Sequence, residues 1–316
     1  MKMRSRENAC LGRAERASAL IAILWIVAIL SMAVFSATQF LFIELESQSN
    51  ASSIFRAEQL ADMGIALAAH PNVETGDPLL SRTVSDNESF FCRISSEGDR
   101  LNLNALLENA EADRIVLEEL FFQWGLRRDE AVDAVDNLVD WIDPDDEPTN
   151  AGAERSYYLS RDRLNHPFNR PFDSLGEVLL VKGFDRVVAA NPAWKDSFTL
   201  LSSGELDLNE APAELVSVVC QCPLETARLF VETRKGFDRV QGTRDDIRFD
   251  DVDSALQLLG IPSGFLDEIG ARVSVEDPAR RLIAIGRHGS IAVERTVTVQ
   301  YTGETGEILR WTTRRI

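Results

Sequence analysis

Histidine and cysteine are scarce in this chain, which has three of the first and four of the second among 316 residues. The histidines, His70, His166 and His288, are far apart in the sequence. No GxSxG, HExxH, Walker or dinucleotide-binding glycine motif is present either. No nucleophile with a nearby base can be nominated, so the sequence predicts a protein that is not an enzyme.

Basic residues are also in short supply, with 33 Lys and Arg against 51 Asp and Glu and a net charge of −18. A body this acidic is repelled by nucleic-acid phosphates and by anionic lipid headgroups. The composition therefore argues against nucleic acid as a partner and favours neutral or cationic partners, including a divalent metal.

The cysteines do not form an obvious disulfide framework. Cys10 lies near the N-terminus, and Cys92, Cys220 and Cys222 follow it. The Cys220–Cys222 spacing is too short for an easy local bridge, and a pairing of Cys92 stays open. We expect small buried apolar residues here.

Charge is absent from one long stretch, Ala19 to Ile43, which at about 1.5 Å per helical residue can cross a hydrocarbon core of about 30 Å. The preceding residues carry five basic and two acidic side chains. The positive-inside rule therefore places the N-terminus in the cytoplasm and the rest of the chain outside it. A cleaved secretory signal has an apolar core of only about 7 to 15 residues, so this longer run favours a membrane-spanning helix.

The helical pattern continues past the apolar run. From Ser18 to Ala69 there is no proline, and Gly64 is the only glycine. Apolar residues such as Leu60 and Ile65 recur mostly at helical spacing, which indicates an amphipathic stem that packs on a globular body. One long helix, half in lipid and half out, is typical of a type IV pilin-like subunit.

The remaining patterns predict an α+β fold in which a large all-helical domain is inserted between strands of an antiparallel sheet. Period-two alternation appears at Ser89–Ser95 and again from Ala271 onward. Between them, Ala110–Trp124 and Asp129–Trp141 have helical spacing. Phe172–Lys182 reads as a helix with Ser174 as its N-cap and Glu177 completing a capping box. Pro71–Asn87 reads as a loop.

This organisation gives five segments. We expect a leader at 1–17, a membrane and stem helix at 18–70, the first part of a pilin-like sheet at 71–100, an inserted helical domain at 101–269, and the C-terminal strands of the sheet at 270–316.

The strongest local constellation lies between Asp143 and Glu154. Counted from Asp143, acidic residues occupy positions 1, 3, 5 and 12, which is the oxygen spacing of a calcium loop. Position 6 is Pro148 where an EF-hand has glycine, so this is not an EF-hand. Close carboxylates repel one another unless a cation lies between them. The candidate ligands are Asp140, Asp143, Asp145, Asp146, Glu147 and Glu154; the alternative is a solvated acidic loop.

Several stretches resemble one family, general secretion pathway protein K, the large minor pseudopilin of type II secretion systems. They are ERASALIAILWIVAIL, DRLNLNALL, VDNLVDWIDPDDEPTNAGAERSYYL, RPFDSLGEVLLVKG and LDLNEAPAELV, in the family's order. The resemblance implies an inner-membrane precursor that a prepilin peptidase cleaves and whose new N-terminus is methylated. It also implies calcium in the helical domain and partnership with minor pseudopilins I and J at the pseudopilus tip.

Mapped onto this chain, cleavage falls between Ala17 and Ser18. The family usually has glycine at the first of these positions. Ala22 stands where most pilins have glutamate, as is typical of protein K. The absence of that glutamate suits a tip subunit, which has no subunit above it whose terminal amine needs neutralising.

The sequence therefore predicts a non-catalytic minor pseudopilin at the tip of the filament, single-pass in the inner membrane with a periplasmic body. Two alternatives stay open. One is a membrane-anchored periplasmic enzyme that uses metal at the acidic loop, and the other is a competence-type pseudopilin that handles DNA.

Overall fold

A computed structural model describes residues 4–70, 72–303 and 305–316, with side chains described from Ile23 onward. Residues 1–3 of the expected leader, and the side chains of the expected cleavage site at Ala17 and Ser18, lie outside that part. The chain divides into two units, residues 1–56 and residues 57–316. Helix α1 (Arg4–Ala68) runs through the first and into the second.

From Arg4 onward the first unit consists of α1. No proline interrupts this 65-residue helix, so its backbone hydrogen bonds continue without a break. From Ile23 onward the helix is long and apolar enough to span a bilayer, with a mean hydropathy of 2.2 and no buried side chains in its most apolar window. An apolar helix that is exposed all round requires lipid or other helices around it.

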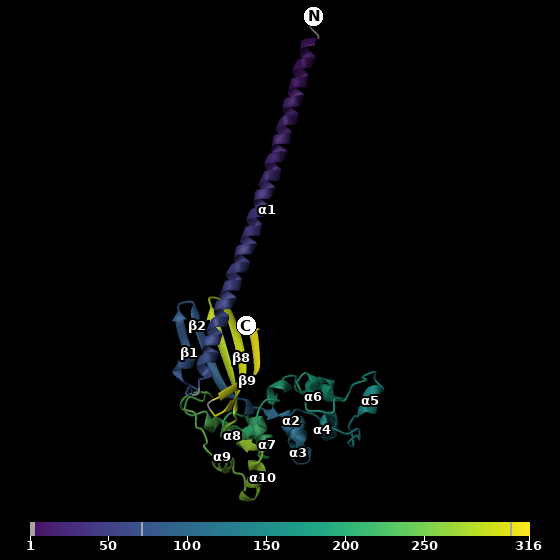
Figure 1. Cartoon of the computed structure of the whole chain (residues 1–316), viewed down its shortest axis with the longest axis vertical. Coiled ribbons are helices and arrows are strands. Elements are labelled where there is room, and N and C mark those ends of the chain that lie inside the picture. The colour runs from purple at the N-terminus through teal and green to yellow at the C-terminus, as the bar shows by residue number, and fades with distance from the viewer. Residues whose placement is uncertain (1–3, 71, 304) are drawn as a thin grey trace. The chain divides into compact units, whose positions relative to one another are not determined.

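A five-stranded antiparallel sheet forms one part of the second unit (Figure 1). Two strands precede the inserted helices in the sequence and three follow them. In spatial order they are β1 (Ser81–Ser85), β2 (Glu88–Ser96), β7 (Ala279–His288), β8 (Ile291–Thr302) and β9 (Thr305–Arg315).

The last turns of α1 pack directly on this sheet. Ala61 and Ile65 share a buried apolar cluster with residues of β2, β7 and β8. The approach is closest at Gly286 of β7, where an added Cβ would lie 2.0 Å from the carbonyl oxygen of Ala57 and 2.4 Å from the amide nitrogen of Ala61. The axis of α1 therefore passes over β7, and only glycine fits there.

The helices between β2 and β7 gather at one end of the sheet (Figure 1). They are α2 (Leu103–Glu108), α3 (Ala110–Gln123), α4 (Arg128–Ile142), α5 (Arg155–Leu159), α6 (Phe184–Ala190), α7 (Ala213–Val219), α8 (Leu224–Arg234), α9 (Val252–Leu258) and α10 (Leu266–Gly270). Two small parallel ladders join β3 (Leu101–Asn102) to β4 (Phe198–Thr199) and β5 (Leu206–Asp207) to β6 (Val273–Ser274). Short 3₁₀ turns lie at Pro78–Leu80, Glu97–Asp99, Glu177–Leu180, Trp194–Ser197 and Ser263–Phe265.

The helical domain has its own hydrophobic core, separate from the cluster under α1. Trp141 lies fully buried in it, and its indole nitrogen donates a 3.0 Å hydrogen bond to Glu177. The free thiols of Cys220 and Cys222 are buried in the same core, whereas Cys92 belongs to the sheet cluster.

Charged side chains tie the helical domain to the sheet where the chain crosses between them. Glu97, at the end of β2, is almost fully buried and accepts hydrogen bonds from Arg100 and from the Thr199 hydroxyl. Arg281 of β7 donates to Asp99 at 2.6 Å and to Glu97 at 3.4 Å. Because these groups satisfy one another away from water, the junction is a defined structure rather than a flexible linker.

The predicted fold class is confirmed: a long N-terminal helix, an antiparallel sheet and a helical domain inserted between strands. Two local predictions are wrong. The segment expected to be a loop, Pro71–Asn87, contains β1, and the helix expected over Phe172–Lys182 shrinks to a turn at Glu177–Leu180. Glu177 does not complete a capping box with Ser174, because its carboxylate accepts hydrogen bonds from Trp141, Arg170 and the backbone amide of Asp173 instead.

Candidate metal centre

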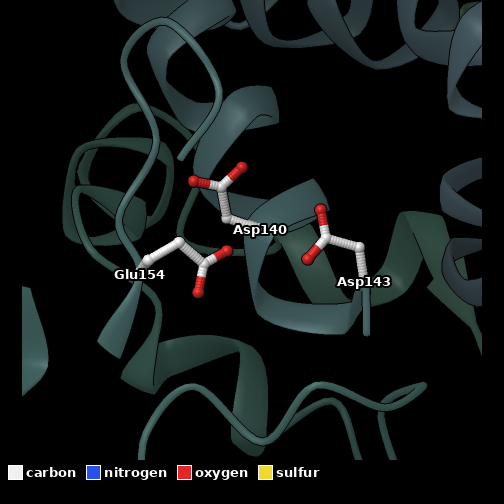
Figure 2. A group of neighbouring side chains, drawn as sticks. All are labelled: Asp140, Asp143 and Glu154. Atoms are coloured by element: carbon white, nitrogen blue, oxygen red, sulfur yellow. The ribbon is translucent and has the colours of Figure 1, made fainter. Parts of the chain in front are cut away.

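The candidate centre forms where α4 ends. Asp140 lies in the last turn of α4, Asp143 is the residue that caps it, and Glu154 precedes α5 after the chain has turned back. Figure 2 shows the three carboxylates close together, with those of Asp143 and Glu154 turned toward each other. One oxygen from each lies within 4.8 Å of the others. The structure therefore brings together three of the six residues that the sequence nominated.

The returning loop is held against α4 by hydrogen bonds. The amide of Thr149 donates to the Asp140 carboxylate at 3.1 Å, and the amide of Ala151 donates to Asp136 at 3.2 Å. From the far side, the Lys182 ammonium donates to the carbonyls of Ala151 and Gly152 at 2.9 and 3.2 Å. The position of Glu154 beside α4 follows from these contacts.

Gly152 permits the closest approach in this loop. A Cβ atom there would lie 1.8 Å from Oδ2 of Asp140 and 2.5 Å from Oγ1 of Thr149. Any larger residue would displace the Asp140 carboxylate or push the loop away from it, and either shift would separate Asp140 from Glu154.

Burial is the main cause that raises the pKa of all three carboxyl groups. The pKa of Asp143 rises from its ordinary 3.8 to about 6, and the charges of Asp145 and Asp140 add to the effect. The pKa of Glu154 rises from 4.5 to about 7, with contributions from Asp140, Asp143 and Asp146 after burial. The pKa of Asp140 is raised as well. At neutral pH the ionised forms of these three carboxyl groups therefore destabilise the folded protein unless a cation lies between them.

The donor set suits a hard cation. Both oxygens of Glu154 and Oδ1 of Asp143 are buried and find no hydrogen-bond donor among the described residues. All candidate donors are carboxylate oxygens, which calcium and magnesium prefer, whereas zinc sites use nitrogen and sulfur more often. Calcium–oxygen distances of about 2.3–2.6 Å allow two ligands on opposite sides of the ion to lie about 5 Å apart. The separations in this group fit that range.

The other three nominated residues lie outside the group. Asp145, Asp146 and Glu147 are exposed, and the carboxylate of Asp145 accepts from the amide of Glu147 at 2.8 Å. Asp145 and Asp146 act on the group through their charge.

Sequence reasoning missed Gly152, Asp136 and Lys182, which position the loop. The glycine two residues before Glu154 could have indicated a tight approach. Asp136 sits one helical turn before Asp140 and was available to the same reasoning. Nothing in the local pattern points to Lys182, which is 30 residues away from Gly152.

A membrane-length helix that packs on an antiparallel sheet, with a helical domain inserted between strands, is a pilin-like fold. Residues 99–191 match the family model of the type II secretion system (T2SS) protein K. The match covers part of the inserted helical domain, so this part of the chain is similar to protein K of type II secretion.

A solved structure agrees with the fold. It is described as the crystal structure of the GspK-GspI-GspJ complex from the enterotoxigenic Escherichia coli type 2 secretion system. One of its chains aligns with a TM-score of 0.63 at 15% identity, over 86% of this chain and 99% of that one. No curated protein matches the chain in sequence.

Proposed function

We propose that this chain occupies the tip of the pseudopilus, where it initiates or caps the filament that exports proteins across the outer membrane. The observation that carries the proposal is the protein K match inside the insertion of a pilin-like scaffold. A bulky insertion beside the sheet suits an end position, because a repeating position requires neighbours both above and below.

In this proposal the chain is a single-pass protein of the inner membrane. The basic residues before the apolar run keep the N-terminus in the cytoplasm, and the body from the sheet onward is periplasmic. During assembly the exposed apolar part of α1 leaves the lipid. Packing against neighbouring stem helices then covers the same surface.

The partners we assign are minor pseudopilins I and J, other pseudopilins of the same system, and the prepilin peptidase. Support for the first two comes from the similar solved structure, which is a complex of three such proteins. Nucleic acid is not among the partners, because the net charge of −18 opposes contact with phosphate.

We assign the chain no catalytic role. His166 lies among the aromatic rings of Trp141 and Phe168 rather than among the carboxylates, and burial lowers its pKa. His70 follows the end of α1 and His288 ends β7, so no described histidine serves as a base beside the acidic group.

Processing is proposed to occur between Ala17 and Ser18, with methylation of the new terminus. N-terminal sequencing of the mature protein is expected to begin at Ser18. A protein that starts at Met1, or at a site after Ile43, would remove the prepilin assignment.

We propose calcium as a structural cofactor held by Asp140, Asp143 and Glu154. The ion would supply two positive charges against the three carboxylates and would fix the end of α4 to the start of α5. Asp145, Asp146 and Glu147, which the sequence also nominated, are not assigned as ligands here, because their side chains are exposed and lie outside the group.

The tip assignment is tested by locating the chain in assembled filaments. A tip subunit is present at one end of each filament, whereas a repeating subunit is present along its length.

A further inference from the structure

The last strand of the sheet has an uncovered face on the side where α1 packs. Val297 and Val299 of β8 point toward α1, because both belong to the buried cluster that contains Ala61 and Ile65. The register pairs Val297 with Trp311 and Val299 with Ile308. Directly paired residues share a face of the sheet, so Trp311 and Ile308 lie on the same side as α1.

Two further residues extend this face toward the end of β9. Arg295, which forms ion pairs with Glu58 and Asp62 of α1, is paired with Thr313, and Val293 is paired with Arg315. We call Ile308, Trp311, Thr313 and Arg315 the β9 shelf.

The β9 shelf is apolar and basic, and α1 does not cover it. Ile308 is 57% exposed and Trp311 is 45% exposed, although both lie beside buried valines. The guanidinium of Arg295 lies 5.4 Å from the centre of the Trp311 ring and supports it from the α1 side. No acidic residue belongs to the shelf, since Glu307 pairs with Gln300 on the opposite face.

The spacing of the sheet indicates what fits this face. The axis of α1 passes over β7, at Gly286. β9 is two strands farther along, which is about 10 Å at the usual strand spacing. Packed helices lie about 8–10 Å apart. A second helix beside α1 would therefore lie directly over the β9 shelf.

We propose that the β9 shelf binds the stem helix of a different pilin-like subunit, through apolar and acidic residues of that helix. The proposal rests on the function proposed above. The chemistry of such stems is visible in this chain, whose own stem exposes Phe42 and Leu45 beside Glu44 and Glu46. Apolar side chains of the partner stem would cover Trp311 and Ile308, and its carboxylates would meet Arg315.

Site-specific photo-crosslinking tests the location. The full chain carries benzoylphenylalanine in place of Thr313, in membranes that contain the other pilin-like subunits of its secretion system. Thr312 is the matched control, because it pairs with Thr296 and points to the opposite face. We expect crosslinks from position 313 to the stem helix of another subunit, and about tenfold fewer from position 312.

Substitutions test the chemistry. Trp311→Ser is expected to weaken co-isolation with the partner about thirtyfold, as loss of an aromatic anchor does. Phe91→Ser, an equally exposed aromatic residue on the opposite face, leaves it unchanged. Arg315→Glu reduces co-isolation about tenfold while Arg314→Glu does not. Melting temperatures of the four variants report whether each one folds.

The outcomes separate this inference from the proposed function. If other pilin-like subunits co-isolate with the chain but position 313 crosslinks to a second copy, a partner strand or a secreted protein, the shelf assignment is wrong and the function stands. Equal yields at positions 312 and 313 would also overturn it. If no pilin-like subunit co-isolates with the unsubstituted chain, both the function and the shelf assignment fall.

Discussion

Calcium added to the metal-free protein at neutral pH raises the free energy of unfolding by about 3–4 kcal/mol when its concentration is several hundred times its dissociation constant. The gain arises because the ion binds the folded arrangement of Asp140, Asp143 and Glu154 and not the unfolded chain. Denaturant titrations with calcium and with a chelator measure it.

The dependence of this stability on pH has a defined sign. The pKa values of Asp143 and Glu154 are higher in the folded protein, at about 6 and about 7, than their ordinary values of 3.8 and 4.5. Without metal, the stability that these groups contribute is complete below about pH 4 and is lost as the pH rises through 6 and 7. For Glu154 alone the shift corresponds to about 3 kcal/mol. Calcium reverses the trend, since the ionised carboxylates are its ligands.

Substitutions of the ligands identify the site. Asp143→Asn together with Glu154→Gln is expected to abolish the gain from calcium and to flatten the metal-free pH dependence. Asp145→Asn with Glu147→Gln, two exposed residues outside the group, serves as the control and retains most of the gain. A double ligand variant that responds to calcium as the unsubstituted protein does would show that the ion binds elsewhere.

The close approach at Gly152 offers a second comparison for the same site. Gly152→Ala places a methyl group against Asp140 and displaces the loop, so it is expected to remove the gain from calcium. Gly176→Ala is the matched control, because a Cβ there meets nothing closer than 3.6 Å.

If the proposed function is right, we expect a single charge in the middle of the apolar stem to stop secretion. Leu30→Arg places a guanidinium near the centre of the span, which costs about 2.5–3.5 kcal/mol in a bilayer. In an assembled filament the same charge would be buried among neighbouring apolar stems. We expect the chain to be lost from membranes and filaments, and secretion to fall to the level of a strain that lacks the gene.

Gln48→Arg is the control for this substitution, because residue 48 lies beyond the apolar run and beside Glu44, with which Gln48 already forms a hydrogen bond. Secretion should continue with Gln48→Arg. Normal secretion with Leu30→Arg would mean that the stem does not serve as both anchor and assembly helix.

The parts of the fold that the sequence predicted well are those with strong periodicity. The missing charges of Ala19–Ile43 and the alternation after Ala271 led to the helix, the sheet and the insertion between strands. The sequence did not predict β1. It is an edge strand whose five residues, SRTVS, are all exposed, so they show no alternation of apolar and polar residues. The capping box expected in Phe172–Lys182 does not form, because the Glu177 carboxylate accepts from Trp141, Arg170 and the amide of Asp173 rather than from Ser174.

The candidate site divides in the same way. Asp143 and Glu154 were found by their spacing and Asp140 by its place one turn earlier on a helix. The sequence could not separate them from Asp145, Asp146 and Glu147, because burial depends on how the loop folds back. The path of the loop depends on the contacts of Gly152 with Asp140 and of Lys182 with Ala151, and the sequence pattern does not reveal these contacts.

We propose above all that this chain sits at the tip of the pseudopilus. An affinity tag placed in the exposed turn at Gly289, labelled with gold in filaments sheared from cells, tests it directly. The account predicts one label at one end of each filament. Labels repeated along the filament, or filaments of normal number and length without any label, would contradict it.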